Sequence, residues 1–313
     1  MKYRRLGKTN LRVSVVGVGT WQFGGEWGKH FTQQEVNDIL ARAKDLGVNL
    51  IDTAECYGDH LSERLIGHAI RGQRDAWILA TKFGHEFRGV GDRRPSWSVD
   101  SVRRQLEDSL RALQTDVIDI YQFHSGSDQV FDRDELWTML DKQVQAGKVR
   151  FLGISISSSR RMDPSHQARR ASDVGASVLQ IVYNRLDRRP ETQIFPYIAD
   201  QDLGVLARVP LASGFLTGKY KPGHRFTDPN DVRSTWDPEH IEQQLREAEK
   251  IARTEVPAGI PMAVWALAWP LQHPLVTCVI PGVKSVAQME INASAADLDA
   301  MVREDHPQAW PEA

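Results

Sequence analysis

The chain repeats one pattern eight times: a short apolar run followed by an amphipathic stretch or a long loop. Most of the runs contain few polar residues, which is typical of strands buried on both faces of a parallel sheet. We expect strands within residues 15–19, 49–54, 77–83, 117–124, 149–156, 178–184, 204–210 and 277–282. Because parallel neighbours need a crossover connection, the alternation predicts an α/β fold.

The stretches between the runs predict helices. The first has clear end signals: Thr32 is a candidate N-cap, Glu35 stands three residues later, and Gly47 can terminate the helix. The other regular patterns cover residues 61–71, 99–113, 134–146 and 191–202, and less regular ones cover 165–174 and 262–271. An opening β-hairpin with its turn at residues 8–10 is also expected.

Eight strand-then-helix units in a chain of 313 residues fit a closed (β/α)₈ TIM barrel. A doubly wound open sheet is the competing interpretation. Residues 212–238, after the seventh strand, form a long irregular segment followed by an extra helix at 240–253, and long loops of this kind are often functional. No linker rich in Pro, Gly and Ser divides the chain, so residues 1–313 are predicted to form a single domain.

The charge balance excludes some classes of partner. Lys and Arg number 39 against 41 Asp and Glu, which argues against a protein that coats nucleic acid or an acidic membrane surface. Only Cys56 and Cys278 are present, so neither a disulfide framework nor a cysteine-rich metal site is expected. The first residues show no secretory signal, and no apolar stretch is long enough to span a membrane. We therefore expect a cytoplasmic protein, and the sequence does not indicate its oligomeric state.

Polar residues stand at the carboxyl ends of the predicted strands, where TIM barrels carry their chemistry. Asp52, Lys82 and His124 end the second, third and fourth runs, and Tyr57 follows the second. The remaining strand-end residues are Thr20, Trp21, Ser155, Gln180, Arg208, Gly282 and Lys284. Buried charges at successive strand ends are costly unless they are paired. A purely structural ion pair explains Asp52 and Lys82 but leaves the other two residues unexplained.

This set of side chains suits the reduction of a carbonyl group. Hydride addition leaves an alkoxide that needs a proton, and the phenol of Tyr57 can supply it. The ordinary tyrosine pKa of about 10 is high for this role, and a neighbouring Lys82 ammonium is expected to lower it. Asp52 can hold Lys82 in place, and His124 can donate a hydrogen bond to the carbonyl oxygen.

Six motifs around these residues resemble those of the aldo-keto reductase family. They are DTAECYGDHLSERLIG, TKFG, DVIDIYQFH, GKVRFLGIS, LASGFLTGKY and IPGVKSVAQMEIN, they occur in the family's order, and they cover about residues 4 to 300. The resemblance implies a (β/α)₈ barrel that uses NADPH, or less often NADH, without a metal. It also implies that Tyr57 is the general acid, with Asp52, Lys82 and His124 as its partners.

The resemblance further implies where the cofactor and the substrate bind. Ser155 and Gln180 would hold the carboxamide, the segment from Gly214 to Lys219 would cover the pyrophosphate, and a carbonyl substrate would contact Trp21, Tyr57 and His124. Lys284, Gln288 and Asn292 would bind the end carrying the adenosine 2′-phosphate. The implied cofactor-binding residues are Thr20, Trp21, Asp52, Ser155, Gln180, Arg208, Pro210, Leu211, Gly214, Leu216, Gly218, Lys219, Gly282, Lys284, Gln288 and Asn292.

The chain departs from the family's pattern at four positions. Ile156 replaces an asparagine, Arg208 replaces a stacking aromatic residue, Val209 replaces a serine, and Ile291 replaces a glutamate. These departures affect the cofactor site and none of the four proposed catalytic positions. In this fold the substrate pocket would be shaped mainly by the loops at 22–31, 85–97, 125–133 and 213–237 and by the tail after 302.

The chain lacks the motifs of two other nucleotide-binding sites. GVGTWQFGG lacks the third glycine of a Rossmann fingerprint, and the GxxxGK spacing after residue 213 is not a Walker loop. A cofactor-binding regulatory subunit without turnover and a phosphate-binding barrel aldolase or isomerase remain as alternatives. The pairs Arg93–Arg94 and Arg169–Arg170 are interpreted as solvated surface.

Overall fold

The computed structural model describes residues 1–159 and 162–310 and contains one sheet of eight parallel strands. In sheet order these are β12 (Cys278–Ile280), β11 (Gly204–Arg208), β10 (Ala176–Val182), β9 (Val149–Ser155), β8 (Ile118–His124), β5 (Ile78–Phe83), β4 (Leu50–Asp52) and β3 (Val18–Gly19). The two outer strands meet: Gly17 N–H donates to Val279 O at 2.8 Å, and a parallel bridge joins Gly19 to Gly282. The predicted closed (β/α)₈ barrel is confirmed, and the open-sheet alternative is wrong.

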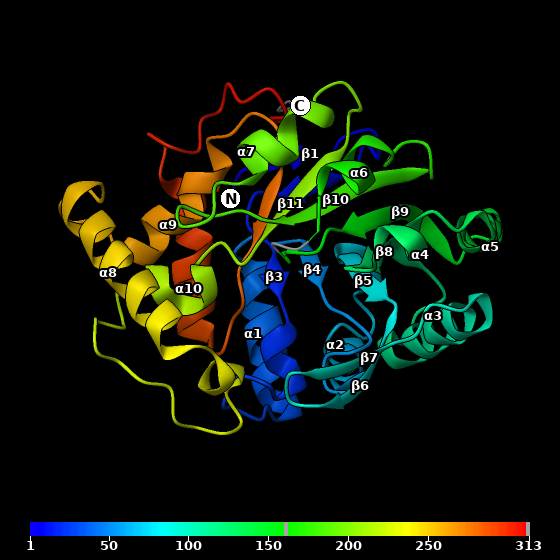
Figure 1. The fold of residues 1–313 in the computed structure, drawn as a ribbon, viewed down its shortest axis with the longest axis horizontal. Helices are drawn as coiled ribbons and strands as arrows, with labels where there is room; N and C mark the ends of the chain where they lie inside the picture. The colour runs from blue at the N-terminus through cyan, green and yellow to red at the C-terminus, as the bar shows by residue number, and fades with distance from the viewer. Residues whose placement is uncertain (160–161, 311–313) are drawn as a thin grey trace.

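Helices surround the strands on the outside of the barrel (Figure 1). They are α1 (Gln33–Asp45), α2 (Leu61–Ala69), α3 (Val99–Leu113), α4 (Asp128–Phe131), α5 (Asp134–Gln145), α6 (Ser165–Arg169), α7 (Pro190–Gln193), α8 (Pro238–Thr254), α9 (Met262–Leu271) and α10 (Val286–Ser294). The end signals predicted for the first helix are confirmed. Thr32 caps α1 in a capping box with Glu35, and Gly47 follows the helix in the left-handed region.

The helix predicted over residues 191–202 is wrong. α7 ends at Gln193, and only a short 3₁₀ turn, Phe195–Tyr197, follows it. Pro196 explains the break, because a proline disfavours α-helical geometry at the preceding residue and lacks the N–H needed to continue the helix. The helix predicted over 165–174 is likewise reduced to α6, with turns after Arg169.

The predicted N-terminal hairpin is present and lies against the amino ends of the strands. β1 (Tyr3–Arg5) pairs antiparallel with β2 (Arg12–Ser14). Leu6 and Val13 pack into the barrel interior with apolar residues of the strands, including Leu50 and Leu206. At this position a side chain on Gly7 would meet the backbone N of Gly204 at 2.2 Å, so the close approach requires glycine. The hairpin thus closes the end of the barrel opposite the polar strand ends.

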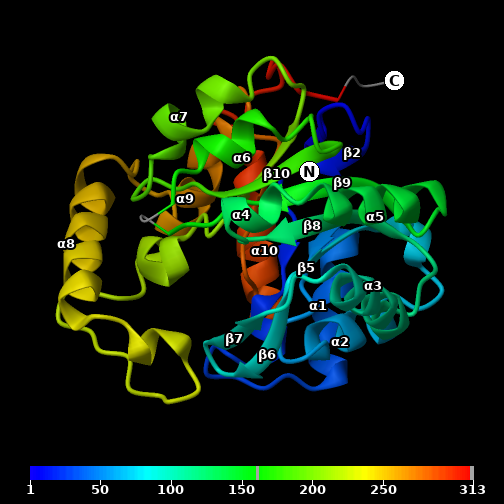
Figure 2. The same cartoon turned by 45° about the vertical axis from the view of Figure 1, so that its right-hand side comes forward.

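Two long loop segments, one after β5 and one after β11, lie at the carboxyl ends of the strands (Figure 2). The loop after β5 folds into an antiparallel hairpin of β6 (His85–Gly89) and β7 (Asp92–Pro95), which the apolar pattern did not predict. The predicted long segment after β11 contains the 3₁₀ turns Ala212–Thr217 and Val232–Thr235 and leads to α8, which stands at the left edge of Figure 2. No helix within the described residues is both long and apolar enough to cross a membrane.

Candidate active site

A cavity of about 580 Å³ opens at the carboxyl ends of the barrel strands. Strand ends and loops from the whole length of the chain line it, which is where TIM barrels place their sites. Among the predicted residues, the lining includes Thr20, Trp21, Asp52, Tyr57, His124, Gln180, Arg208, Pro210, Leu211, Gly214, Lys219, Gly282, Lys284, Gln288 and Asn292. The structure therefore brings most of the predicted site residues into one cavity.

The four predicted catalytic side chains form one cluster at the inner end of the cavity. The Lys82 Nζ donates to Asp52 Oδ1 at 2.7 Å and to the backbone oxygen of Thr53 at 2.6 Å. The same Nζ lies 3.3 Å from the hydroxyl of Tyr57. Lys82 and Asp52 are buried, so their pairing replaces the hydration that both charges lose. The ion pair with Asp52 thus holds the Lys82 ammonium next to the Tyr57 hydroxyl.

A row of amides secures the other oxygen of Asp52. Gln180 Nε2 donates to Asp52 Oδ2 at 2.6 Å, and Gln122 Nε2 donates to it at 3.1 Å. Ser155 is buried and donates to Gln180 Oε1 at 3.3 Å, so it acts on the cavity through Gln180 rather than by lining it. Gln122 was missed by the sequence analysis. The signal was present, since it stands two residues before His124 in β8, and alternate residues of a strand point to the same face.

Tyr57 lies between two rings at the cavity wall. The Trp21 ring stacks on it at a centroid distance of 6.0 Å, and the imidazole of His124 stands nearly perpendicular to it at 6.3 Å. Burial raises the pKa of Tyr57, and the Lys82 ammonium opposes the increase without reversing it. The predicted lowering by Lys82 is therefore confirmed as a contribution, but the larger effect of burial, which was not predicted, sets the net direction. Burial, reinforced by the charge of Lys82, holds the pKa of His124 well below its usual range, which keeps the ring neutral.

The segment after β11 places its predicted residues in two groups. Leu211 and Gly214 line the cavity, with Gly214 at a φ of 99°. Leu216 instead packs in an apolar cluster with Leu245 of α8. Gly218 ends the 3₁₀ turn in the left-handed region, next to Lys219, which does line the cavity. The turn thus presents backbone and small residues to the cavity and anchors itself through its apolar side chains.

Arg208 ends β11 and points into the cavity, as predicted. Its Nη2 donates to the backbone oxygen of Ile156 at 3.0 Å. Its Nε is buried without a hydrogen-bond partner, and within residues 1–159 and 162–310 no carboxylate forms an ion pair with the guanidinium. Burial lowers the pKa of Arg208. A cavity-lining cation that has no ion-pair partner among the described residues and one buried, unpaired N–H favours an anionic or dipolar ligand beside it.

The outer end of the cavity is rich in cations. Lys284 donates to the backbone oxygen of Trp27, and burial together with the charge of Arg233 lowers the pKa of Lys284. Gln288 Oε1 accepts from the Lys284 N–H at 2.8 Å, and Asn292 Nδ2 donates to Gly282 O at 3.3 Å. These contacts fix the start of α10 beside the lysine. Because like charges crowd here, an anion bound at this end would be stabilised.

A buried glutamate, Glu26, joins three loops over the cavity, and the sequence analysis missed it. Its carboxylate accepts from Trp21 Nε1 and Arg93 Nη2, both at 2.8 Å, and from the Gly91 N–H at 3.1 Å. Its backbone oxygen accepts from the Val232 N–H at 3.0 Å. The interpretation of Arg93 as solvated surface is wrong, because it pairs with Glu26 and lines the cavity, whereas its neighbour on the hairpin is exposed. No local sequence pattern reveals a contact between residues 67 positions apart.

Both the sequence and the fold of this chain are similar to those of known proteins. The model of the Aldo/keto reductase family matches residues 15–309. The chain belongs to this family. An aldo-keto reductase of Bacillus subtilis, YhdN, is 31% identical over 93% of this chain and 87% of its own length. The holo form of aldo-keto reductase AKR11C1 from Bacillus halodurans superposes with a TM-score of 0.78 at 30% identity, covering 98% of this chain and 95% of that one.

The family also contains relatives with a different description. A probable voltage-gated potassium channel subunit beta of Arabidopsis thaliana is 29% identical over 95% of this chain and 92% of its own length. The names of the relatives and structural neighbours support an oxidoreductase, and members of the family use nicotinamide cofactors. This aldo-keto reductase barrel therefore carries its cavity where the family's fold expects chemistry.

Proposed function

We propose that this protein reduces an aldehyde or ketone to the alcohol with NADPH, and that Tyr57 is the general acid. One observation supports this most strongly: the Tyr57 hydroxyl stands at the cavity wall 3.3 Å from Lys82 Nζ, which Asp52 holds at 2.7 Å. A phenol backed by a fixed ammonium is a proton donor whose phenolate is stabilised when the proton leaves.

Each side chain then has a task. Tyr57 gives its phenolic proton to the oxygen of the substrate carbonyl. Lys82 stabilises the phenolate, and Asp52 keeps Lys82 charged and in place. The neutral ring of His124 can donate an N–H to the same oxygen and so orient the carbonyl. Trp21 stacks on the phenol and covers one side of the substrate space.

The cavity fits a dinucleotide with a negatively charged end. The buried Nε of Arg208 lacks a partner at the inner end, and the cations around Lys284 crowd the outer end. Gly214 also lines the cavity, and its φ of 99° favours glycine, so the loop presents no side chain there. Gln180 and Ser155 would face the carboxamide, and Lys284, Gln288 and Asn292 the 2′-phosphate. When bound, the cofactor supplies the hydride that adds to the carbonyl carbon.

A fluorescence titration with NADPH, followed by turnover of a reactive aromatic aldehyde, tests the proposal. We expect saturable binding and consumption of NADPH that depends on the aldehyde. Binding without turnover across a panel of aldehydes and ketones would instead support a regulatory subunit, the second candidate, which the similarity to the potassium channel subunit favours. The complete set of Tyr57, Lys82, Asp52 and His124 favours catalysis.

A further inference from the structure

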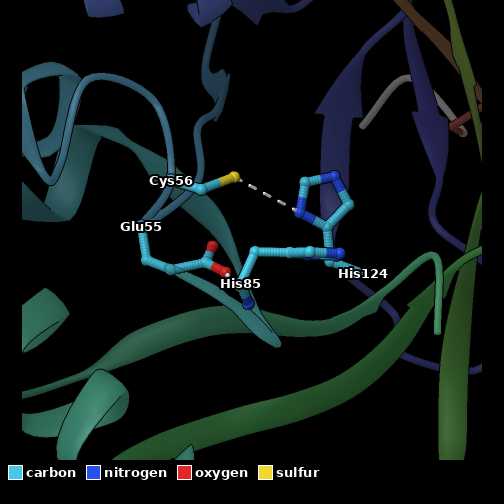
Figure 3. A group of neighbouring side chains, drawn as sticks. All are labelled: Glu55, Cys56, His85 and His124. Carbon is cyan, nitrogen blue, oxygen red and sulfur yellow. Dashed lines mark hydrogen bonds between the residues drawn. The ribbon is translucent and has the colours of Figure 1, made fainter. Parts of the chain in front are cut away.

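Four side chains with metal-binding atoms converge in the wall behind the cavity (Figure 3). Glu55 and Cys56 come from the segment after β4, His85 begins β6, and His124 ends β8. One ligand atom from each lies within 4.8 Å of those of the other three. The Sγ of Cys56 is 3.8 Å from Nδ1 of His124, and the two imidazoles stand perpendicular at a centroid distance of 5.1 Å.

Two atoms of this cluster are buried without a partner. Glu55 is 2% exposed, and its Oε2 accepts no hydrogen bond, although its Oε1 accepts from the His85 N–H at 2.9 Å. The Nδ1 of the His85 ring is also buried and unpaired. By contrast, the neighbouring buried carboxylate of Glu63 accepts from Thr81 at 2.6 Å and from Ser109 at 3.2 Å. Unpaired buried polar atoms are rare in folded proteins, so these two atoms are available to bind a ligand.

We propose that Glu55, Cys56, His85 and His124 form a binding site for a zinc-type divalent ion. Two imidazoles, one thiolate and one carboxylate match the ligands and the fourfold coordination that zinc prefers. The thiolate and the carboxylate balance the two charges of the ion. As the Zn–S bond forms, the S–H bond of Cys56 breaks and its proton passes to solvent.

The surroundings set the selectivity of this site. Burial and the charge of Glu55 raise the pKa of the Cys56 thiol, and the nearby cations Arg93 and Lys82 oppose this increase without reversing it. The same two cations repel a divalent ion, and only strong metal–sulfur and metal–nitrogen bonds can offset that repulsion. Magnesium and calcium prefer oxygen ligands and bind such a set poorly. The site therefore selects zinc, or cobalt as its spectroscopic substitute, over the hard cations.

Metal binding at this site would inhibit turnover. Around one zinc ion, neighbouring nitrogen and sulfur ligands stand about 3.3–3.7 Å apart. The distance of 3.8 Å between Cys56 Sγ and His124 Nδ1 is already close to this range. The ligand atoms of other pairs lie up to 4.8 Å apart and must move closer together. Coordination holds the His124 imidazole on the ion, so the ring is no longer free to orient the carbonyl oxygen. This consequence rests on the proposed function, because it assumes that His124 orients the carbonyl, but the binding itself does not.

The test uses the whole protein after dialysis against a chelator. We add Co²⁺ and record the absorption spectrum, then measure Zn²⁺ affinity by competition, in the wild type and in Cys56→Ala. We expect intense tetrahedral cobalt bands with a sulfur-to-cobalt charge-transfer band, lost in Cys56→Ala together with a fall of about tenfold or more in Zn²⁺ affinity. Cys278→Ala is the matched control, since Cys278 is the chain's other buried cysteine and its Sγ lies against Val279 O.

The outcomes separate the two proposals. A wild type without the charge-transfer band, or equal Zn²⁺ affinity in Cys56→Ala and Cys278→Ala, would overturn the metal site. Glu55→Gln gives a second variant in case Cys56→Ala folds poorly, and it should also weaken Zn²⁺ binding. Inhibition by Zn²⁺ but not by Mg²⁺, absent in Cys56→Ala relative to its own metal-free rate, would support the link to His124. A protein without any carbonyl turnover refutes the proposed function and leaves the cobalt spectrum as the test of the site.

Discussion

Replacing Tyr57 by Phe removes one oxygen atom from the proposed acid and little else. The phenyl ring can keep the stack on Trp21 at 6.0 Å and its position 4.9 Å from Lys82 Nζ. Lys82 loses only the 3.3 Å contact and retains its shorter bonds to Asp52 and Thr53. The fold and the cofactor site should therefore survive the change.

The expected cost falls on turnover. Loss of a positioned proton donor lowers the rate by a factor on the order of 10² to 10⁴, equivalent to about 2.7–5.4 kcal/mol of activation free energy. The assay follows consumption of the reduced nicotinamide in the presence of an aromatic aldehyde, with the NADPH dissociation constant and the unfolding temperature measured alongside.

The matched control is Tyr3→Phe, which also removes one phenolic oxygen. The Tyr3 hydroxyl donates to Gly47 O at 2.8 Å, in the hairpin at the opposite end of the barrel. Its loss should cost about 1 kcal/mol of stability and leave turnover unchanged. Near-wild-type turnover in Tyr57→Phe would refute the acid assignment. A fall in turnover matched by an equal loss of NADPH affinity would show that the ring matters for binding rather than for proton donation.

Three further predictions follow from the cavity and the hairpin. An ammonium facing a phosphate contributes roughly 1.5–3 kcal/mol, so NADPH should bind at least about tenfold more tightly than NADH. Lys284→Ala should reduce this difference in affinity, and equal affinities for the two cofactors in the wild type would contradict the assignment. The cation of Arg208 should disfavour the oxidised, positively charged nicotinamide, so NADPH should bind more tightly than NADP⁺. If fluorescence titration gives the same ratio of the two dissociation constants in Arg208→Tyr as in the wild type, Arg208 does not act on the nicotinamide. Burial, followed by the charge of Arg4, lowers the pKa of His306 to about 4. Below about pH 6.5 this histidine is protonated in the unfolded chain but stays neutral in the native protein. The free energy of unfolding therefore falls as the pH drops from about 6.5 to about 4. Urea unfolding across this range should show a shallower pH dependence in His306→Asn, and identical slopes would contradict the assignment.

The strand pattern of the sequence established the parallel α/β sheet and the position of its chemistry, and closure of the sheet is seen in the pairing of its outer strands. Eight apolar runs that alternate with helical stretches favour a parallel sheet buried on both faces, and in such a sheet all carboxyl ends face the same way. Asp52, Lys82 and His124, each at the end of a run, therefore had to meet, and the structure places Tyr57 beside them. The caps of α1 were equally predictable, because Thr32, Glu35 and Gly47 act through backbone groups a few residues away.

What surrounds these residues depends on how distant segments of the chain pack together. The hairpin of β6 and β7 depends on contacts with other loops, and Glu26 gathers partners far along the chain, so no local pattern signals either. The same holds for His85, which folding brings beside Cys56. The direction of the Tyr57 pKa was also open, since a neighbouring lysine lowers it and burial raises it. The depth of burial decides which effect prevails, and depth is a property of the packed barrel rather than of the residue order.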